Sequence, residues 1–479
     1  MIDNWQVALP ALIVAATAFL VMAADVTARS PDGDLLAALG IMGLLVAGGA
    51  AVVLWLGDGP SAGFGETLRG DRYALFFTLL VCSASLLTLL MSVDFLRDHA
   101  LPAGEYYALV LLSTCGMVFL ASANDLIVVF LALEIMSVAV YVLAGLARRE
   151  VRSTEAALKY FLLGAFATGF LLYGIAFFYG ATGSTRLDVI AQAIARDGLR
   201  PFTALGIALV LVGFGFKVAL IPFHVWTPDV YEGAPTAVTA FMAVGVKAAA
   251  FAAFARVFVA ALSGVAPSWS ALLALLAALT MTVGNVTALL QRSVKRMLAY
   301  SSIAHAGYAL LGLVVATRDG GAALCFYLAV YTFMTLGAFA VVIALGRRGE
   351  PNEDLADWAG VGFRHPVLGL SMVVFMLSLA GIPPTAGFAG KFYLFSAAID
   401  AGWTSLAVIG VLNAVVSVYY YLGVLVAMYM AEGTRAIVPP TSRPYLLATI
   451  LVTVAATIVI GVLPAEPMRL AERAFVSLR

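Results

Sequence analysis

Cysteine is scarce in this chain of 479 residues, and its three cysteines stand apart from one another. Cys82, Cys115 and Cys325 each lie in an apolar run, and no Cys-x-x-Cys spacing occurs. Zinc sites and iron–sulfur clusters need grouped cysteine or histidine ligands, so the sequence argues against both. The phosphate-binding loop G-x-x-x-x-G-K-[ST] is also missing. We therefore expect no metal, nucleotide or redox cofactor on this chain.

Charge is equally scarce. Only 11% of the residues are charged and 63% are hydrophobic, whereas about a quarter of a soluble domain is charged. Basic and acidic residues balance at 27 each, so no excess of positive charge points to nucleic acid. Apolar runs of about twenty residues recur from end to end, which is typical of a multi-pass protein in a lipid bilayer. The first run, 7–23, lacks a basic leader, so we expect a retained helix.

We predict an all-α membrane fold of about fourteen transmembrane helices. They are expected at 5–24, 35–56, 73–94, 106–123, 125–147, 155–180, 202–221, 236–260, 269–290, 299–316, 322–345, 365–382 with a continuation to 400, 404–430 and 444–463. An even number puts both termini on one side. The loops after odd-numbered spans carry more lysine and arginine, so the positive-inside rule predicts that they are cytoplasmic and that the termini face outward.

Almost all of the lysines lie in expected membrane spans. Of the 27 basic residues only five are lysines, and four of these lie inside expected spans: Lys159, Lys217, Lys247 and Lys391. Arginine keeps its proton in a protein, whereas a desolvated lysine can release it. A charge at the bilayer centre costs roughly 2.5–3.5 kcal/mol, so four lysines are hard to explain as packing. Glu134 is the one acid expected well inside a span, and Arg256, near a helix end, is expected to snorkel.

Proline breaks two of the expected spans beside a lysine. In 213–236, three prolines follow Lys217, and in 377–395 the pair Pro383-Pro384 precedes Lys391. Proline cannot continue a regular helix, and irregular backbone at membrane depth must line protein or a cavity. The breaks fall in spans seven and twelve, an odd offset of five. Paired breaks of this kind predict two inverted five-helix repeats, spans 4–8 and 9–13, around an ion path.

This pattern divides the chain into four parts. The expected parts are 1–105 with the first three helices, 106–262 with the first repeat, 263–431 with the inverted second repeat, and 432–479 with helix fourteen and a short tail.

Four runs resemble a known family. FGFKVALIPFHVWTPDVYEGAPT (214–236) and RSVKRMLAYSSIAHAGY (292–308) resemble the antiporter-like proton-translocating subunits of respiratory complex I, the bacterial NADH:quinone oxidoreductase. ALKYFLLGAFATGFLLYGIAFFYGATGS (157–184) and GFAGKFYLFSAAI (387–399) resemble one branch of that family, which has a lysine in the twelfth span and no long lateral helix.

The resemblance implies a non-redox translocase subunit in the bacterial inner membrane, with its termini in the periplasm. Its partners would be an antiporter-like neighbour, small membrane subunits and lipid. The FMN, iron–sulfur clusters and quinone that supply the energy would lie in partner subunits. Proton transfer would follow buried lysine and glutamate side chains and water.

The resemblance also assigns residues. Glu134 and Lys217 resemble the family's carboxylate–lysine pair, Lys247 its central connecting residue, and Lys391 the lysine of the second half-path. A close pair would keep the lysine charged, and separation would free its proton. Three further residues lie in or beside matching motifs with less defined roles: Lys159, His224 and His305.

Structural roles compete with several of these assignments. Lys159 has Glu155 four residues before it, an ordinary pair on one helix face. His224 would cap carbonyls freed by the first break, His305 would bond two helices, and Glu134 would be a neutral hydrogen-bonded acid. The tyrosines, including those at 419–421, are expected to be packing residues or interface anchors.

Three other functions fit parts of the pattern. A cation/proton antiporter subunit would need several oxygen ligands for sodium, and the expected core offers one carboxylate. A purely structural membrane subunit would need its four lysines in static pairs. A transporter of organic anions could use those lysines to bind its substrate, and the family motifs argue against it.

Overall fold

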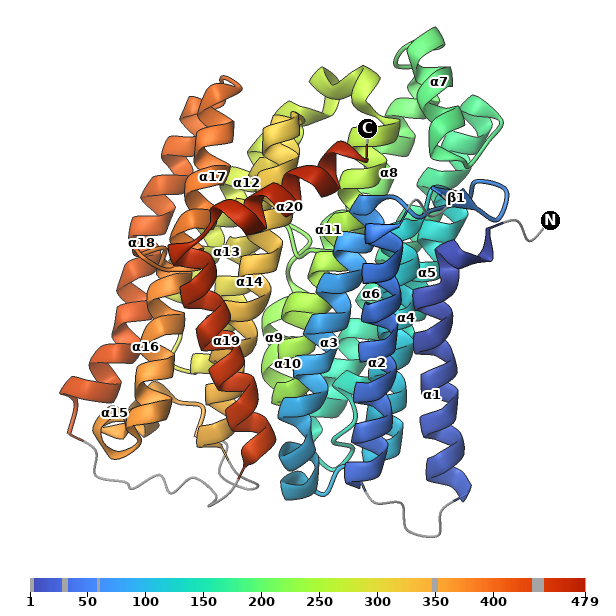
Figure 1. The fold of residues 1–479 in the computed structure, drawn as a ribbon. Coiled ribbons are helices and arrows are strands. Elements are labelled where there is room, and N and C mark those ends of the chain that lie inside the picture. The colour runs from blue at the N-terminus through green and yellow to red at the C-terminus, as the bar shows by residue number, and fades with distance from the viewer. Residues whose placement is uncertain (1–3, 28–32, 58–60, 347–351, 433–442, 479) are drawn as a thin grey trace.

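The chain folds into a bundle of long helices that stand roughly side by side (Figure 1). The computed structural model describes residues 4–27, 33–57, 61–346, 352–432 and 443–478. Within them, twelve helices are long and apolar enough to cross a membrane, and two shorter apolar helices end at the predicted breaks. The all-helical membrane class is therefore confirmed. The total of fourteen spans and the four-part division of the chain remain predictions.

The first part of the bundle runs to the first break. Its elements are η1 (Trp5–Ala8), α1 (Leu9–Thr27), α2 (Gly33–Leu56), the two-stranded hairpin β1 (Ala62–Gly63) and β2 (Leu68–Arg69), α3 (Arg72–His99), α4 (Ala103–Ser122), α5 (Leu126–Ala144), α6 (Val151–Thr182), α7 (Leu187–Asp197) and α8 (Pro201–Lys217).

The rest of the chain holds the second break. Its elements are α9 (Trp226–Gly233), α10 (Thr236–Phe241), η2 (Met242–Val246), α11 (Lys247–Ala255), η3 (Arg256–Ala261), η4 (Ser263–Val265), α12 (Ala266–Ala288), α13 (Val294–Val315), α14 (Arg318–Leu345), η5 (Leu355–Trp358), α15 (Val361–Arg364), α16 (Pro366–Ala380), α17 (Ala386–Asp400), α18 (Thr404–Met430), α19 (Pro444–Val462) and α20 (Ala465–Val476). The segments η2 and η3 are single π-helical turns, and α10 to η3 form one continuous span.

Polar caps fix where several helices begin. The Asp125 carboxylate accepts from the Ile127 amide at 2.8 Å, which starts α5 only a few residues after α4 ends. Ser293 caps α13 through the Arg296 amide at 3.2 Å. Such caps satisfy N–H groups that have no partner inside the helix. The closely spaced pair of spans at 106–123 and 125–147 is therefore two separate helices.

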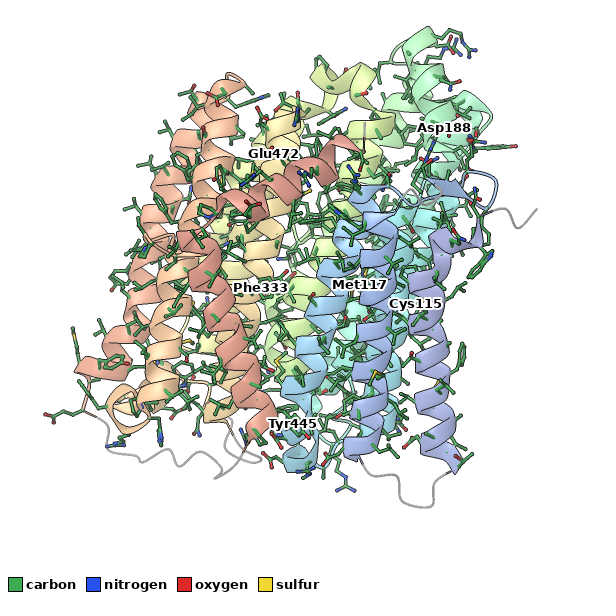
Figure 2. All side chains as sticks on the ribbon, in the orientation of Figure 1. Cys115, Met117, Asp188, Phe333, Tyr445 and Glu472 are labelled. Atoms are coloured by element: carbon green, nitrogen blue, oxygen red, sulfur yellow. The ribbon has the colours of Figure 1, made fainter. Side chains whose placement is uncertain are left out.

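Two amphipathic helices lie outside the set of membrane-spanning helices, and the sequence analysis expected neither. The first, α7, buries Leu187, Ile190 and Ile194. At its start Arg186 pairs with Asp188 at 2.5 Å, and this guanidinium holds the pKa of the Asp188 carboxyl below its usual range. Figure 2 shows Asp188 and the C-terminal Glu472 near the same end of the bundle, and Tyr445 near the opposite end.

The second amphipathic helix is α20, where only a short tail was expected. It lies across the upper part of the bundle in Figure 1 and contacts α3 and α14. Ala471, Ala474 and Phe475 form its buried stripe. The Phe475 ring occupies the space beside Gly321, where a Cβ would lie 1.9 Å from the ring. The C-terminal segment is therefore packed against the bundle.

Both proline breaks occur where the sequence predicts them. After α8 the backbone passes through Ala219 at φ 64° and a cis Ile221–Pro222 bond before α9 begins. After α16 it passes through Gly381 at φ 87° and a cis Pro383–Pro384 bond before α17 begins. Figure 1 shows α8 and α17 in the upper half of the bundle, and α9 and α16 in the lower half. The chain thus crosses the two breaks in opposite directions, as inverted repeats would require.

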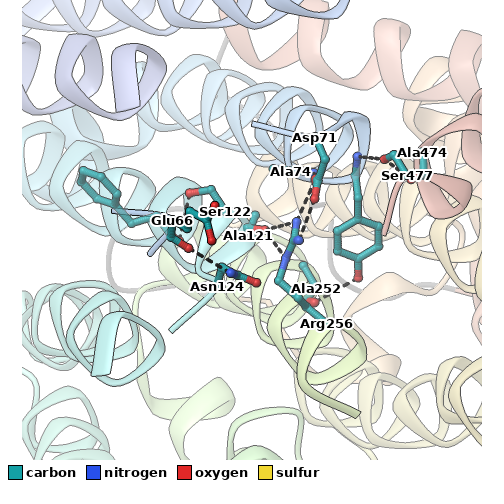
Figure 3. A network of polar contacts seen from close by, with 12 residues as sticks. Glu66, Asp71, Ala74, Ala121, Ser122, Asn124, Ala252, Arg256, Ala474 and Ser477 are labelled. Carbon is teal, nitrogen blue, oxygen red and sulfur yellow. Dashed lines mark hydrogen bonds and ion pairs between the residues drawn. The ribbon is translucent and has the colours of Figure 1, made fainter. Parts of the chain in front are cut away.

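Arg256 does not snorkel, contrary to the expectation. Its side chain is buried and donates to both Asp71 carboxylate oxygens, at 2.7 and 2.8 Å, and to the Ala121 carbonyl (Figure 3). Asp71 also caps α3 by accepting from Ala74 at 2.8 Å. The ring of Tyr73 lies 5.1 Å from the guanidinium. The pair therefore ties η3 to the start of α3 and the end of α4.

This buried pair gives a stability prediction. Removing one partner of a buried ion pair costs about 3–5 kcal/mol, because the other charge is left uncompensated. We expect Arg256→Met to lower the unfolding temperature of the protein in membranes. The double variant Arg256→Met/Asp71→Asn removes both charges, keeps an oxygen for the Ala74 cap, and should recover part of that loss. Additive losses for Asp71→Asn and Arg256→Met would contradict the pairing.

Candidate functional site

Three lysines are buried in the middle of the bundle. Lys217 and Lys247 are each 3% exposed and Lys391 is 4% exposed. Lys217 ends α8 at the first break, Lys391 lies on α17 after the second break, and Lys247 follows the π turn η2. Within the part of the chain that the structure describes, no carboxylate lies within ion-pair distance of any of them. Their partners are neutral groups.

Aromatic rings and a hydroxyl surround Lys217. Its Nζ donates to the Tyr160 hydroxyl at 3.4 Å and lies 5.1–5.3 Å from the ring centres of Tyr160 and Tyr141. The Tyr160 ring stacks on Trp226 of α9 at 4.2 Å. The Trp226 indole in turn donates to the Phe216 carbonyl at 3.1 Å, and this carbonyl also accepts from the Ala219 amide in the break. The broken helix and the lysine's surroundings are therefore one packed unit.

Glu134 faces Lys217 without touching it. It lies on α5, half-buried, and its Oε1 is buried with no hydrogen-bond partner among the described residues. Tyr141, two helical turns further along α5, has a buried hydroxyl that is also unpartnered within the described residues. The carboxylate–lysine pair of Glu134 and Lys217 therefore remains a prediction.

Lys247 is held by the backbone and hydroxyl of Ser302 on α13. Its Nζ donates to the Ser302 carbonyl at 2.5 Å and also contacts the Ser302 hydroxyl. The ring of Tyr331 on α14 lies 5.8 Å away. A π turn adds one residue to a helical turn and is often found at functional sites. Here η2 immediately precedes Lys247, in a helix that is buried along its whole length.

His305 lies between the second and third lysines. Its Nδ1 bonds the Tyr327 hydroxyl at 2.6 Å and its Nε2 bonds the Tyr421 hydroxyl at 3.1 Å. The Tyr421 hydroxyl also bonds Ser301, next to the residue that holds Lys247. His305 therefore joins Tyr327, Tyr421 and Ser301 in one hydrogen-bonded group beside Ser302.

The ammonium group of Lys391 caps the C-terminal end of α16. Its Nζ donates to the carbonyls of Leu379 and Ala380, each at 2.9 Å. These carbonyls belong to the last turn before the break, where the helix carries partial negative charge. The Tyr308 ring, three residues after His305, lies 4.9 Å from the ammonium. The break therefore supplies the ligands of the lysine.

Lys159 and His224 lie at the edge of this site. Lys159 is 39% exposed in its side chain and pairs with Glu155 and Asp229, both at 2.7 Å. Arg296 joins Asp229 at 3.0 Å and Glu232 at 2.5 Å, which completes a charged cluster at one end of α6 and α9. A polar cavity of about 230 Å³ lies against Lys159 and Asp229. His224, in the first break, is half-buried, and its Nδ1 has no partner among the described residues.

Sequence reasoning missed the hydroxyls of the site. The tyrosines at 419–421 were expected to be packing residues or anchors. Tyr419 is exposed, but Tyr421 bonds His305, and Tyr420 donates to Asn285 at 2.8 Å. Only helical spacing could have signalled any of these groups, since Tyr141 and Tyr308 follow Glu134 and His305 on the same helix faces.

The site contains several kinds of side chain that can exchange protons. Lysine, histidine, tyrosine and serine side chains form separate hydrogen-bonded groups around the three buried lysines. Buried polar atoms without a protein partner, such as Glu134 Oε1 and the Tyr331 hydroxyl, are usually bonded to buried water. Within the described residues, no group of three or more His, Cys, Asp or Glu side chains could hold a metal.

Comparisons with known proteins point to one family. The family model described as NADH:quinone oxidoreductase/Mrp antiporter, TM, matches residues 123–417. NADH-quinone oxidoreductase subunit N of Trichlorobacter lovleyi is 47% identical over 98% of this chain and 97% of its own length. NADH-quinone oxidoreductase subunit N 2 of Roseiflexus castenholzii is 44% identical over 98% of this chain and 96% of its own length.

Solved structures share the fold. A chain of respiratory complex I from Thermus thermophilus with bound aureothin has a TM-score of 0.81 and 38% identity, over 96% of this chain and 98% of that one. A chain of the Mrp complex from Dietzia sp. DQ12-45-1b has a TM-score of 0.88, over 100% of this chain and 98% of that one. Its identity of 23% supports a common fold only.

The helix-end site of Lys391 gives a second prediction. Gly381 has a left-handed φ of 87°, and a Cβ there would lie 2.9 Å from Lys391 Cδ. Gly381→Ala should therefore destabilise the protein by about 1–3 kcal/mol and displace the ammonium from the α16 carbonyls. The control is Gly169→Ala on α6, where a Cβ meets open space and should not destabilise. Equal unfolding temperatures for the two variants in membranes would contradict the site.

Proposed function

Since the chain belongs to the NADH-quinone oxidoreductase subunit N family, we propose that it conducts protons through the membrane arm of that complex along its row of buried lysines. The observation that carries the proposal is the set of three buried ammonium groups with no carboxylate partner within the described residues. A lysine held by an anion keeps its proton, whereas one held by neutral dipoles can release it.

The first step is assigned to Glu134 and Lys217. In the separated arrangement seen here, the lysine has one long bond to Tyr160, and a carboxylate oxygen of Glu134 is unpartnered within the described residues. An approach of the two side chains would favour the charged lysine, and their separation would release its proton. The rings of Tyr141 and Tyr160 keep the ammonium in place in either arrangement.

The next steps pass from Lys247 toward Lys391. Lys247 hands its proton to water beside Ser302 and to the group of Ser301, Tyr421 and His305. The imidazole bonds two hydroxyls and can accept on one nitrogen while it donates from the other. Lys391 then holds the proton at the open end of α16, next to the second break.

Each broken helix is proposed to open a path to one membrane face. The cluster of Lys159, Asp229, Glu232 and Arg296 would collect protons at one end, because its polar cavity adjoins α9 of the first broken helix. His224, with an unpartnered nitrogen and a place in the break itself, would contact the entering water. By the positive-inside rule we place this end on the cytoplasmic side of the bacterial inner membrane and the termini in the periplasm. The loops 28–32, 347–351 and 433–442, which carry part of that charge excess, lie outside the described residues.

The energy is proposed to come from other subunits, which would carry the FMN, iron–sulfur clusters and quinone. The resemblance in fold to an Mrp chain makes a cation/proton antiporter the main rival. Sodium prefers several oxygen ligands, but the carbonyls at the second break are taken by Lys391. The site is therefore better suited to protons than to metal cations, and pumping that is independent of sodium would separate the two functions.

Lys217 offers the central test. In the intact complex in native membranes, Lys217→Ala should lower proton pumping by about tenfold or more, because it removes an obligatory proton carrier. Lys217→Arg should fail as well, since arginine keeps the charge but does not release the proton. NADH:quinone turnover and proton uptake would be measured together, with assembly checked on native gels.

The matched control is Arg256→Lys, another buried basic residue whose role is structural. Its Asp71 partner remains, so pumping should stay near the wild-type level. An assembled Lys217→Ala complex with unchanged turnover and pumping would show that this lysine is structural, and would contradict the proposed relay.

A further prediction concerns His305. Replacing it with phenylalanine keeps an aromatic ring against Tyr331 but removes both hydrogen bonds to tyrosine. We expect the proton yield per NADH oxidised to fall, because the connection from Lys247 to Lys391 is interrupted. Tyr393→Phe on α17 is the control, since Tyr393 contributes a ring contact with Phe326 that phenylalanine would keep. A normal yield in His305→Phe would remove the histidine from the path.

A further inference from the structure

A groove runs along α18 at the surface of the bundle. It has a volume of about 760 Å³ and lies between the end of α12, the start of α13 and the later turns of α18. Its walls are mainly apolar: Leu289, Met297, Val415, Val418, Leu422 and Val426. Several of these α18 side chains are exposed, including Val415 at 65%. We refer to this feature as the α18 groove.

A cationic end distinguishes the α18 groove from an ordinary apolar surface. Arg292, in the short connection between α12 and α13, lines it and has an exposed side chain. The Leu355 amide donates to the Arg292 carbonyl at 2.9 Å, and the Gly360 amide donates to Ala427 on α18 at 3.3 Å. These contacts place Arg292 beside the C-terminal end of α18. That end is where the helices reach the membrane surface.

Arg292 makes no ion pair within the described residues. The carboxylates of the segment 353–357, whose backbone pairs with residues 292–294, have other partners. Glu353 pairs with Lys295 at 3.2 Å, and Asp354 and Asp357 form the capping box of η5. A guanidinium with five N–H donors at the end of an apolar groove matches a phosphate group, which arginine binds through two parallel hydrogen bonds.

The length of the groove fits one lipid leaflet. From Val415 to Val426 helix α18 rises about 16 Å. Half of a hydrocarbon core that is about 30 Å thick is about 15 Å. An acyl chain whose head group sits at Arg292 would therefore run along α18 to the middle of the membrane.

We propose that the α18 groove is a binding site for one acidic phospholipid, with its phosphate at Arg292 and one acyl chain along α18. A zwitterionic lipid carries a cationic group beside its phosphate, so its head group has no net negative charge to attract Arg292. A soluble anion would leave the apolar walls uncovered. An isoprenoid chain would cover the walls but leave the guanidinium without an anion.

The test uses the intact complex and two photoreactive lipids, phosphatidylglycerol and phosphatidylcholine, each with a diazirine on one acyl chain. Labelled peptides are mapped by mass spectrometry. We expect phosphatidylglycerol to label 415–426 and 289–297 more strongly than phosphatidylcholine. Arg292→Gln should lower the phosphatidylglycerol labelling about fivefold, toward that of phosphatidylcholine, because one basic side chain near the surface is lost.

A second variant tests the groove itself. A Cβ at Gly423 would meet open space, so Gly423→Leu should fill the α18 groove without displacing its neighbours and remove labelling by both lipids. Arg149→Gln, an exposed arginine in the α5–α6 connection, and Gly169→Leu, an open glycine on α6, are the matched controls and should leave labelling unchanged.

Three results would overturn the proposal. Equal labelling by the two lipids in the wild type would show that Arg292 does not select an anion. Persistent labelling in Gly423→Leu would place the lipid elsewhere. Absence of label at 415–426, with cross-links to a neighbouring subunit instead, would show that protein covers the groove.

Discussion

The structure depends on burying ammonium groups in a membrane without giving them counter-ions. Each lysine is stabilised by a different neutral dipole: a tyrosine hydroxyl for Lys217, a serine for Lys247, and helix-end carbonyls for Lys391. A carboxylate would stabilise the charge further but would also hold the proton. At the second break the interruption leaves the last carbonyls of α16 free to act as ligands for Lys391. There, the same local feature breaks the helix and stabilises the buried ammonium.

The buried cations of this bundle differ in their partners: Arg256 has a carboxylate partner, and the buried lysines have neutral ones. Arg256 is as buried as the lysines but has the Asp71 carboxylate in bidentate contact, so its charge is fixed. It ties η3 to the start of α3 and the end of α4 (Figure 3). The lysines lie among hydroxyls and rings that can rotate or admit water. In the proposed relay, replacing lysine by arginine at these positions would therefore keep the charge but remove the exchangeable proton.

The sequence predicts the parts of this site whose causes are local. Proline, glycine and an intramembrane lysine lie together in the chain at two places, so both breaks and the lysines beside them, Lys217 and Lys391, could be identified. The hydrogen bonds of His305 could not, because Tyr421 lies 116 residues away and only packing brings it near. The same reason explains the error on Arg256, whose partner is 185 residues away. The helix α20 was missed because its stripe of small apolar residues is short and its binding surface is made by α3 and α14.

The two halves of the path differ in what can move. In the first half, Glu134 has a buried carboxylate oxygen with no hydrogen-bond partner within the described residues, and the Lys217 ammonium has one long bond to Tyr160. In the second half the ligands of Lys391 are backbone carbonyls, which cannot move without displacing α16. Coupling to a distant energy source requires an element with two arrangements. The carboxylate–lysine pair fits that requirement and the carbonyl-held lysine does not. In the proposed relay, the switch is therefore best placed in the first half, with the second half as a fixed acceptor.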